Sequence, residues 1–169
     1  MAANDFPDIR KALEKRLFQT LGGIFVDPDA DIFVEPTSGA TLIEPSGGED
    51  EPIAIAWENV DFNPMDGLNE WVRSQIDVVG QRPSAVGVGA MVKHEGLFLV
   101  DCFVRYQTLA AGPAAADLLA QRIQDAFAYG TILTHNGKRV YIRNAQRSGG
   151  RTDSPWFFVP VSIEFYSYI

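Results

Sequence analysis

The acid-rich stretch near residue 30 is the nearest approach to a metal site in this chain. Asp27-Pro28-Asp29-Ala30-Asp31 imitates the opening of a calcium-binding loop, which presents oxygen ligands at alternate positions. Such a loop also needs glycine at its sixth position and glutamate at its twelfth, where this chain has Ile32 and Ser38. An acidic turn is the better interpretation, so we expect no bound metal and no cofactor.

The remaining chemistry-bearing residues do not form a catalytic set. A catalytic histidine needs a nucleophile and an orienting partner, whereas His94 and His135 each stand at a predicted turn. The single cysteine, Cys102, alternates with apolar neighbours, which is typical of a buried small hydrophobe. Gly87-Val88-Gly89 lacks the third glycine and the following helix of a dinucleotide site, so small residues in an edge strand or close packing between subunits explain it better. We therefore predict that the chain is not an enzyme.

A basic group lies in the last third of the chain. Arg139, Tyr141, Arg143 and Arg147 alternate, which predicts one shared strand face. Arginines with an interleaved tyrosine are compatible with a nucleic-acid surface. The net charge of −8 opposes that reading, because nucleic-acid binding requires cations against phosphates. Contact with an acidic neighbouring subunit is the stronger hypothesis.

The acids are as unevenly distributed as the bases. Between Arg16 and Arg73 the chain has no lysine or arginine and twelve acids, and no acid lies between Asp125 and Asp153. One interpretation is a solvated acidic loop and a solvated basic hairpin. The other is electrostatic complementarity between neighbouring subunits, since opposite patches steer association and fix register. The candidates for that contact are Arg139, Arg143 and Arg147 on one side, and Asp29, Asp31 and Glu35 on the other.

Apolar periodicity predicts two helices to position these residues. The first spans 7–21, where Ile9, Leu13 and Leu17 recur every four residues and a proline opens the helix. The second spans about 113–129 and is followed by Gly130, a residue that favours helix ends. Residues 22–52 are rich in glycine, proline and acids, which predicts an extended, partly β excursion at the surface.

Strands are predicted over most of the remaining chain. They cover 53–60, 71–79, 85–93 and 97–107, with a turn at His94-Glu95-Gly96 between the last two. Asn136-Gly137 predicts a tight hairpin, and 156–169 predicts a long closing strand in which Pro160 marks an edge or a bulge. This order predicts an α+β fold: a mostly antiparallel sheet with both helices packed on one face.

Length and composition bound the alternatives. A chain of 169 residues that is 46% apolar suits one domain, 1–169, with a sizeable core. No apolar run approaches the roughly 20 residues that span a membrane. The N-terminus has no basic start and no apolar core, so we expect no secretion signal. A single cysteine fits a reducing cytoplasm.

An ordered set of motifs resembles the tail terminator proteins of long-tailed bacteriophages. The set comprises an opening helix, the strand I-x-W-E-N-x-x-F-x-P at 55–64, W-V-R at 71–73, G-x-x-x-V-D-x-F-V at 96–104, an alanine-rich helix at 114–129 and the closing strand 156–169. The ordered set is specific although no single piece is. The 22–52 excursion is longer than the pattern requires.

The resemblance implies a structural role in the virion. Such proteins form a hexameric ring that caps the tail tube, stops its polymerisation and receives the head connector. The implied partners are further copies of the chain, the tail tube protein, the head-completion or stopper protein, and genomic DNA that passes through the lumen without specific binding; no membrane is involved. The implied location is the head–tail joint, after assembly in the host cytoplasm. Acids facing the bore would repel phosphate, which gives the acidic bias a purpose.

Two other readings stay open at this point. One is another tail-joint or tail-tube component, because tube proteins share an antiparallel sheet and helix plan. The other is a small ligand-binding or enzymatic α+β domain, which would need an apolar pocket with convergent polar groups.

Overall fold

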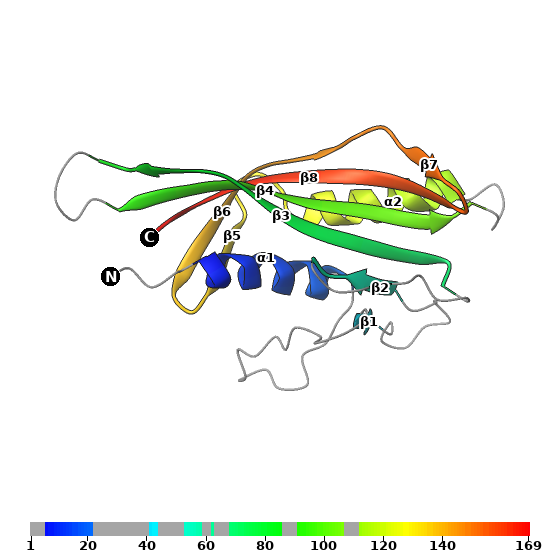
Figure 1. The fold of residues 1–169 in the computed structure, drawn as a ribbon, viewed down its shortest axis with the longest axis horizontal. Helices are drawn as coiled ribbons and strands as arrows, with labels where there is room; N and C mark the ends of the chain where they lie inside the picture. Colours follow the sequence, from blue (N-terminus) through cyan, green and yellow to red (C-terminus); the bar gives the residue numbers. More distant parts are fainter. Residues whose placement is uncertain are drawn as a thin grey trace.

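The computed structural model describes residues 6–21, 41–43, 53–58, 62, 68–85, 91–106 and 112–169. Within these ranges it has two helices and eight strands (Figure 1). Their bounds in chain order are α1 Phe6–Thr20, β1 Thr41–Ile43, β2 Ile53–Ala56, β3 Glu70–Pro83, β4 Val92–Arg105, α2 Gly112–Ala126, β5 Ile132–His135, β6 Lys138–Arg147, β7 Arg151–Asp153 and β8 Trp156–Tyr168. The predicted α+β class is confirmed. Apart from β1, the predicted 22–52 excursion lies outside the described residues.

The described strands form one curled sheet. Its order is β1-β2-β3-β4-β8-β6-β5, and β7 pairs with the start of β8. The β2–β3 pair is parallel, and the other pairs are antiparallel. Figure 1 shows the long strands β3, β4 and β8 running side by side along the molecule. These three strands are the platform on which the rest is arranged.

Strand β4 runs straight through the place where a turn was predicted. The separate strand 85–93 and the turn at His94-Glu95-Gly96 are wrong, because 92–105 is one strand paired with β3 and β8 along its length. Gly96 is buried, and a Cβ built there would lie 2.6 Å from Phe165 Cζ and 2.8 Å from the Asp77 carbonyl oxygen. The glycine therefore serves close packing within the sheet rather than a turn.

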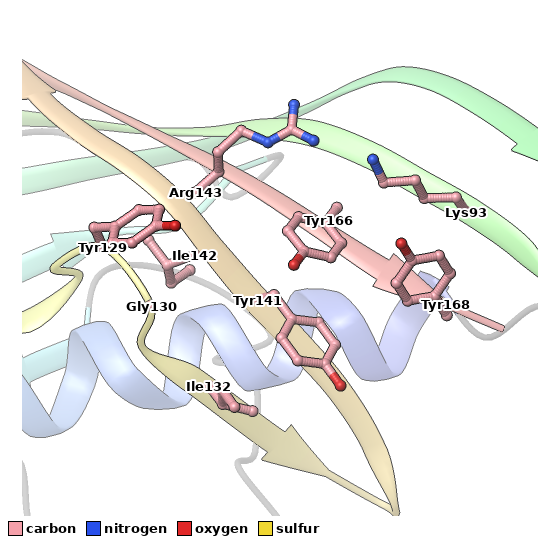
Figure 2. A pocket seen from close by; sticks show the side chains of 9 residues that line it. All are labelled: Lys93, Tyr129, Gly130, Ile132, Tyr141, Ile142, Arg143, Tyr166 and Tyr168. Carbon is pink, nitrogen blue, oxygen red and sulfur yellow. The ribbon is translucent and has the colours of Figure 1, made fainter. Parts of the chain in front are cut away.

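The hairpin between β5 and β6 is confirmed. Asn136 and Gly137 have φ of 46° and 75°, the left-handed pair that a two-residue hairpin turn requires. The second helix ends at Ala126, three residues before its predicted end at 129. Gly130 does adopt a positive φ of 81°, but its N–H bonds the Ile142 carbonyl of β6 and so directs the chain into β5. Figure 2 shows the hairpin with Ile132 and Tyr141 on it.

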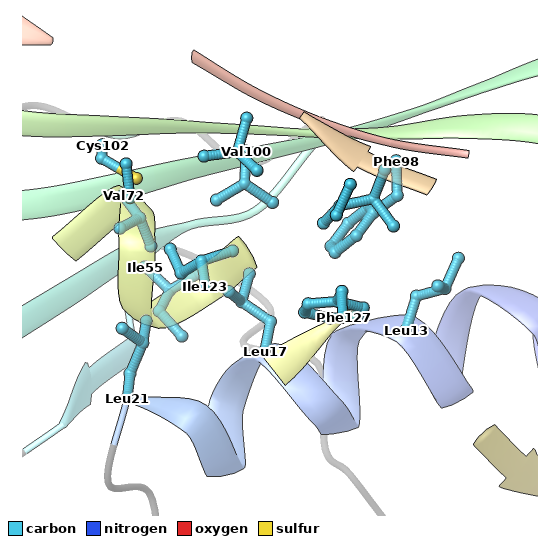
Figure 3. Packing of buried hydrophobic residues seen from close by; sticks show 14 of the residues in the cluster. Leu13, Leu17, Leu21, Ile55, Val72, Phe98, Val100, Cys102, Ile123 and Phe127 are labelled. Atoms are coloured by element: carbon cyan, nitrogen blue, oxygen red, sulfur yellow. The ribbon is translucent and has the colours of Figure 1, made fainter. Parts of the chain in front are cut away.

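The main core joins both helices to inward-facing residues of the strands. Ile9, Leu13 and Leu17 of α1 are fully buried, as their spacing predicted. They meet Ile123 and Phe127 from α2 and its C-terminal end, and a set of strand residues that Figure 3 shows pointing toward them: Ile55, Val72, Phe98, Val100 and Cys102. All belong to one contiguous apolar cluster. Burial of this cluster is the principal stabilising contribution.

Two arginines of α1 connect the helix to other elements. Arg10 Nη2 lies 2.7 Å from Glu58 Oε2, which also accepts a 3.4 Å hydrogen bond from the Ile76 N–H of β3. Glu58 of the W-E-N motif therefore links α1 to the sheet. Arg16 Nε donates to the Ala126 carbonyl at the end of α2 (3.0 Å), one of the carbonyls that lack helical partners.

Pro160 lies inside β8 rather than at an outer edge of the sheet. It stands opposite Asp101 of β4, and its carbonyl accepts a hydrogen bond from the Ser148 N–H. The carbonyl and nitrogen of one strand residue point the same way. The proline nitrogen thus faces the short stretch between β6 and β7. Since no strand pairs with this side of β8 at Pro160, the missing N–H leaves no ladder hydrogen bond unmade, and the predicted edge exists only at this position.

Candidate subunit-contact surface

The sheet has a second face, opposite the strand side chains that belong to the main core. Along β4, Phe98, Val100 and Cys102 face the core, so Lys93 and Glu95 fall on the opposite side. The apolar cluster on this second face contains no helix residue among those described. We call this second face of the sheet the outer face. Its two ends differ in the side chains that they carry.

One end of the outer face is an aromatic cluster that the chain buries for itself. Trp71 and Phe103 stack at 4.0 Å with an interplanar angle of 3°, and Trp156 meets Trp71 edge-on at 5.9 Å. All three are buried, with Phe62 and Phe158 packed against them. Arg73 pairs with Asp101 at 2.6 Å beside this cluster. This end of the outer face is therefore a second, smaller hydrophobic core.

The other end is a tyrosine-lined hollow of about 360 Å³ (Figure 2). Tyr141 of β6 stacks on Tyr166 of β8 at 5.1 Å, and Tyr168 meets both rings edge-on. Lys93 Nζ lies 4.8 Å and Arg143 Cζ 5.4 Å from the centre of the Tyr166 ring, within cation–π range. The residues that line the hollow are Lys93, Tyr129, Gly130, Ile132, Tyr141, Ile142, Arg143, Tyr166 and Tyr168.

Glu95 is the acid at the centre of this end. Its carboxylate lies 2.6 Å from Lys93 Nζ, 2.7 Å from Arg82 Nη2 and 3.1 Å from Arg143 Nη2. The hydrogen bond from Lys93, helped by the charges of the arginines, lowers the pKa of Glu95 from 4.5 to about 2 despite partial desolvation. Three cations around one carboxylate leave a surplus of two positive charges.

The structure divides the predicted basic group between two faces. Arg139 and Arg143 are exposed near the hollow, but a bulge between Ile142 and Asn144 shifts the alternation of β6. Arg147 therefore turns toward α2, where its Nη1 donates to the Asp117 carbonyl at 3.3 Å. The expectation of one shared face is wrong for Arg147 because the bulge adds a residue. Three acids proposed as their counterparts lie outside the described residues: Asp29, Asp31 and Glu35.

The other candidate residues serve the fold. His94 lies within β4, not at a turn, and His135 is buried at the end of β5 with Nε2 4.0 Å from Asp8 Oδ1. Cys102 is buried, and desolvation, with Asp101 and Glu70 adding to it, raises the pKa of its thiol far above its usual range. Among the described residues no three metal-ligating side chains cluster. Nor is any helix in those ranges long and apolar enough to cross a membrane.

Sequence reasoning missed Lys93, Glu95 and Tyr166 as parts of a surface. The signal available was the alternation of Tyr166 and Tyr168 with Phe165 and Ser167, which places two tyrosines on the polar side of a strand. That pattern does not say which strand lies beside β8. Without the pairing of Tyr166 with Glu95 and Tyr141, the cluster cannot be assembled.

Comparison with known proteins identifies a family. The model of the phage tail terminator protein family matches residues 8–165. A solved structure of a protein without a descriptive name superposes with a TM-score of 0.64 at 17% identity, covering 99% of this chain and 97% of that one, which shows a shared fold. A chain of the virion of a native gene transfer agent particle has a TM-score of 0.44 at 16% identity, covering 68% and 78%, too distant to support an argument. No curated protein matches the sequence.

Proposed function

The chain belongs to the phage tail terminator family, whose members are structural components of the virion rather than enzymes, and from that premise we propose that it forms the ring that caps the tail tube. In this proposal six copies close a ring on the last layer of the tube, stop its polymerisation and present a surface for the head connector. The observation that carries the proposal is the match to the family model over residues 8–165.

The proposed ring requires a heterologous interface, in which one surface of a subunit meets a different surface of the next. An acid-rich first half and a basic group later in the chain suit such a contact. We therefore retain Arg139, Arg143 and Arg147 as candidates on one side and Asp29, Asp31 and Glu35 on the other. Since Arg147 contacts α2 within the chain, Arg139 and Arg143 are the stronger two.

The remaining features of the proposal follow from the family. Residues 1–169 act as one domain, and both helices cover one face of the sheet, which the shared core cluster supports. The partners are the tail tube protein and the head-completion protein, and DNA passes through the lumen without specific binding. The net charge of −8 favours that passage, because acids repel phosphate. The ring sits at the head–tail joint after assembly in the host cytoplasm.

Electron microscopy tests this function directly. Negative-stain images of the purified protein, with mass measurement of the same sample, should show closed rings of about six subunits, the closed symmetry that a heterologous contact generates. Long filaments instead would favour the alternative of a tube component. If the isolated chain is a monomer, gold-labelled antibodies on intact virions decide the matter: label at the head–tail joint supports the proposal, and its absence there refutes it.

A further inference from the structure

The tyrosine-lined hollow is the part of the outer face that the chain leaves unfilled. At the opposite end Trp71, Phe103 and Trp156 are buried within the chain. In the hollow, by contrast, Tyr129 is 84% and Tyr168 is 38% exposed, and Ile132 beside them is 55% exposed. Tyrosine and arginine, with tryptophan, are enriched at the energetic centres of protein interfaces. A hollow with this lining is suited to a protein partner.

The charge of the hollow selects among partners. Three cations surround Glu95, namely Arg82, Lys93 and Arg143, and its single negative charge neutralises only one of their positive charges. Arg143 keeps 49% of its side chain exposed while it contacts Glu95, so its remaining N–H groups are available to an incoming acceptor. The exposed phenol groups add further donors. The chemistry that complements this lining is a carboxylate-bearing segment with apolar residues between its acids.

The chain itself supplies such a segment. Residues 27–51 contain eight acids and no lysine or arginine, and Ile32, Phe33 and Val34 lie among them. Its charge is opposite to that of the hollow, and each copy of the chain carries both. A contact between the hollow of one copy and the acidic segment of the next is heterologous and repeats around a ring.

We propose that the hollow lined by Tyr141, Tyr166 and Arg143 binds the acidic segment 27–51 of a second copy of this chain. The inference rests on the proposed ring, and it specifies which surfaces meet. Arg143 and Lys93 hold carboxylates, the tyrosine rings cover the apolar residues between them, and Glu95 keeps the two cations in position. Glu95 acts as a positioning residue because its own carboxylate is already occupied.

A peptide titration measures the contact. The probe is a fluorescein-labelled peptide of residues 27–51. The acceptor is the full chain with its own segment neutralised by substitutions that keep side-chain size: Asp27→Asn, Asp29→Asn, Asp31→Asn, Glu35→Gln, Glu44→Gln, Glu49→Gln, Asp50→Asn and Glu51→Gln. Fluorescence anisotropy should show saturable binding that weakens as salt is added. A peptide with the same acids replaced by amides should bind at least roughly tenfold more weakly, and equal binding would overturn the proposal.

Variants of the hollow locate the site. Arg143→Glu and, separately, Tyr129→Ser should each weaken peptide binding by roughly tenfold, since truncated interface anchors have effects of that size. The matched control is Arg151→Glu, an exposed arginine on β7 at the other end of the sheet, which should change binding by less than about twofold. Both test residues are substantially exposed, so the unfolding curves of both variants should stay near that of the wild type. Unchanged binding in both would overturn the proposal.

Mixing two defective copies tests whether the contact joins different molecules. One copy carries Arg143→Glu with native acids, and the other carries the neutralised segment with a native hollow. Because only one productive contact remains, native mass spectrometry should show a one-to-one complex in the mixture and none with either copy alone. Absence of the complex, or binding of labelled duplex DNA in place of the peptide, would overturn the inference. If the Arg143→Glu variant still forms rings like those of the wild type, this contact is refuted and the proposed function stays intact.

Discussion

Substituting Gly96 by alanine should destabilise the chain strongly for so small a change. The new Cβ would lie 2.6 Å from Phe165 Cζ and 2.8 Å from the Asp77 carbonyl oxygen, against the roughly 3.5–4.0 Å that suits two carbons. Neither neighbour moves easily, because Phe165 is 3% exposed and the carbonyl belongs to the backbone of the adjacent strand. Overpacking of this kind costs about 1–3 kcal/mol of the free energy of unfolding. The expected drop in Tm is roughly 2–4 °C for each kcal/mol.

The matched control for this substitution lies one strand away. Gly80 lies in β3 between Val79 and Gln81, opposite Glu95, and an added Cβ there meets nothing within 4 Å. Gly80→Ala should therefore stay within about 0.5 kcal/mol of wild type. Urea and thermal unfolding of both variants give the comparison. A Gly96→Ala chain as stable as wild type, or as stable as Gly80→Ala, would refute the packing explanation and revive the turn that the sequence suggested.

Three further outcomes can be measured on the same samples. Because the pKa of Glu95 falls from 4.5 to about 2 on folding, its carboxylate stabilises the fold fully above pH 4.5. Glu95→Gln should therefore destabilise the chain at pH 7, and urea titrations should show this difference shrinking between pH 4.5 and 2. Leu17→Ala should cost about 2–5 kcal/mol of unfolding free energy, whereas Leu118→Ala, 72% exposed on α2, should stay within about 0.5 kcal/mol. The Cys102 thiol should react with Ellman's reagent only after denaturation, because burial raises its pKa; rapid reaction of the native chain would contradict its placement.

The features predictable from the sequence are those that depend on neighbours along the chain. Asn136-Gly137 specifies a hairpin because the two residues tolerate positive φ wherever they occur. The leucines of α1 reveal its buried side because helical spacing is local. His94-Glu95-Gly96 was misread because glycine favours turns locally, and its real requirement comes from Phe165, 69 positions away. The contacts that explain the glycine exist only after β4 and β8 have paired.

The bulge in β6 shows the same limit for the candidate surface. Alternation predicts which side chains share a face only while the register is continuous. One extra residue near Arg143 leaves Arg139 and Tyr141 on the outer face and carries Arg147 to the side of α2. Which residue a strand bulges at depends on its partner strand, here β8, and single-sequence periodicity has no access to it.

The two ends of the outer face show two ways in which the chain limits the exposure of aromatic surface to water. Trp71, Phe103 and Trp156 have large apolar areas, and the chain buries them. The tyrosines at the other end stack on one another and on cations, so their ring faces are partly covered while their hydroxyl groups can remain hydrated. Such a surface tolerates water before assembly and still offers rigid aromatic area to a partner afterwards. In the ring that we propose, a subunit would benefit from this combination before it assembles, because an apolar patch of the same size would favour aggregation.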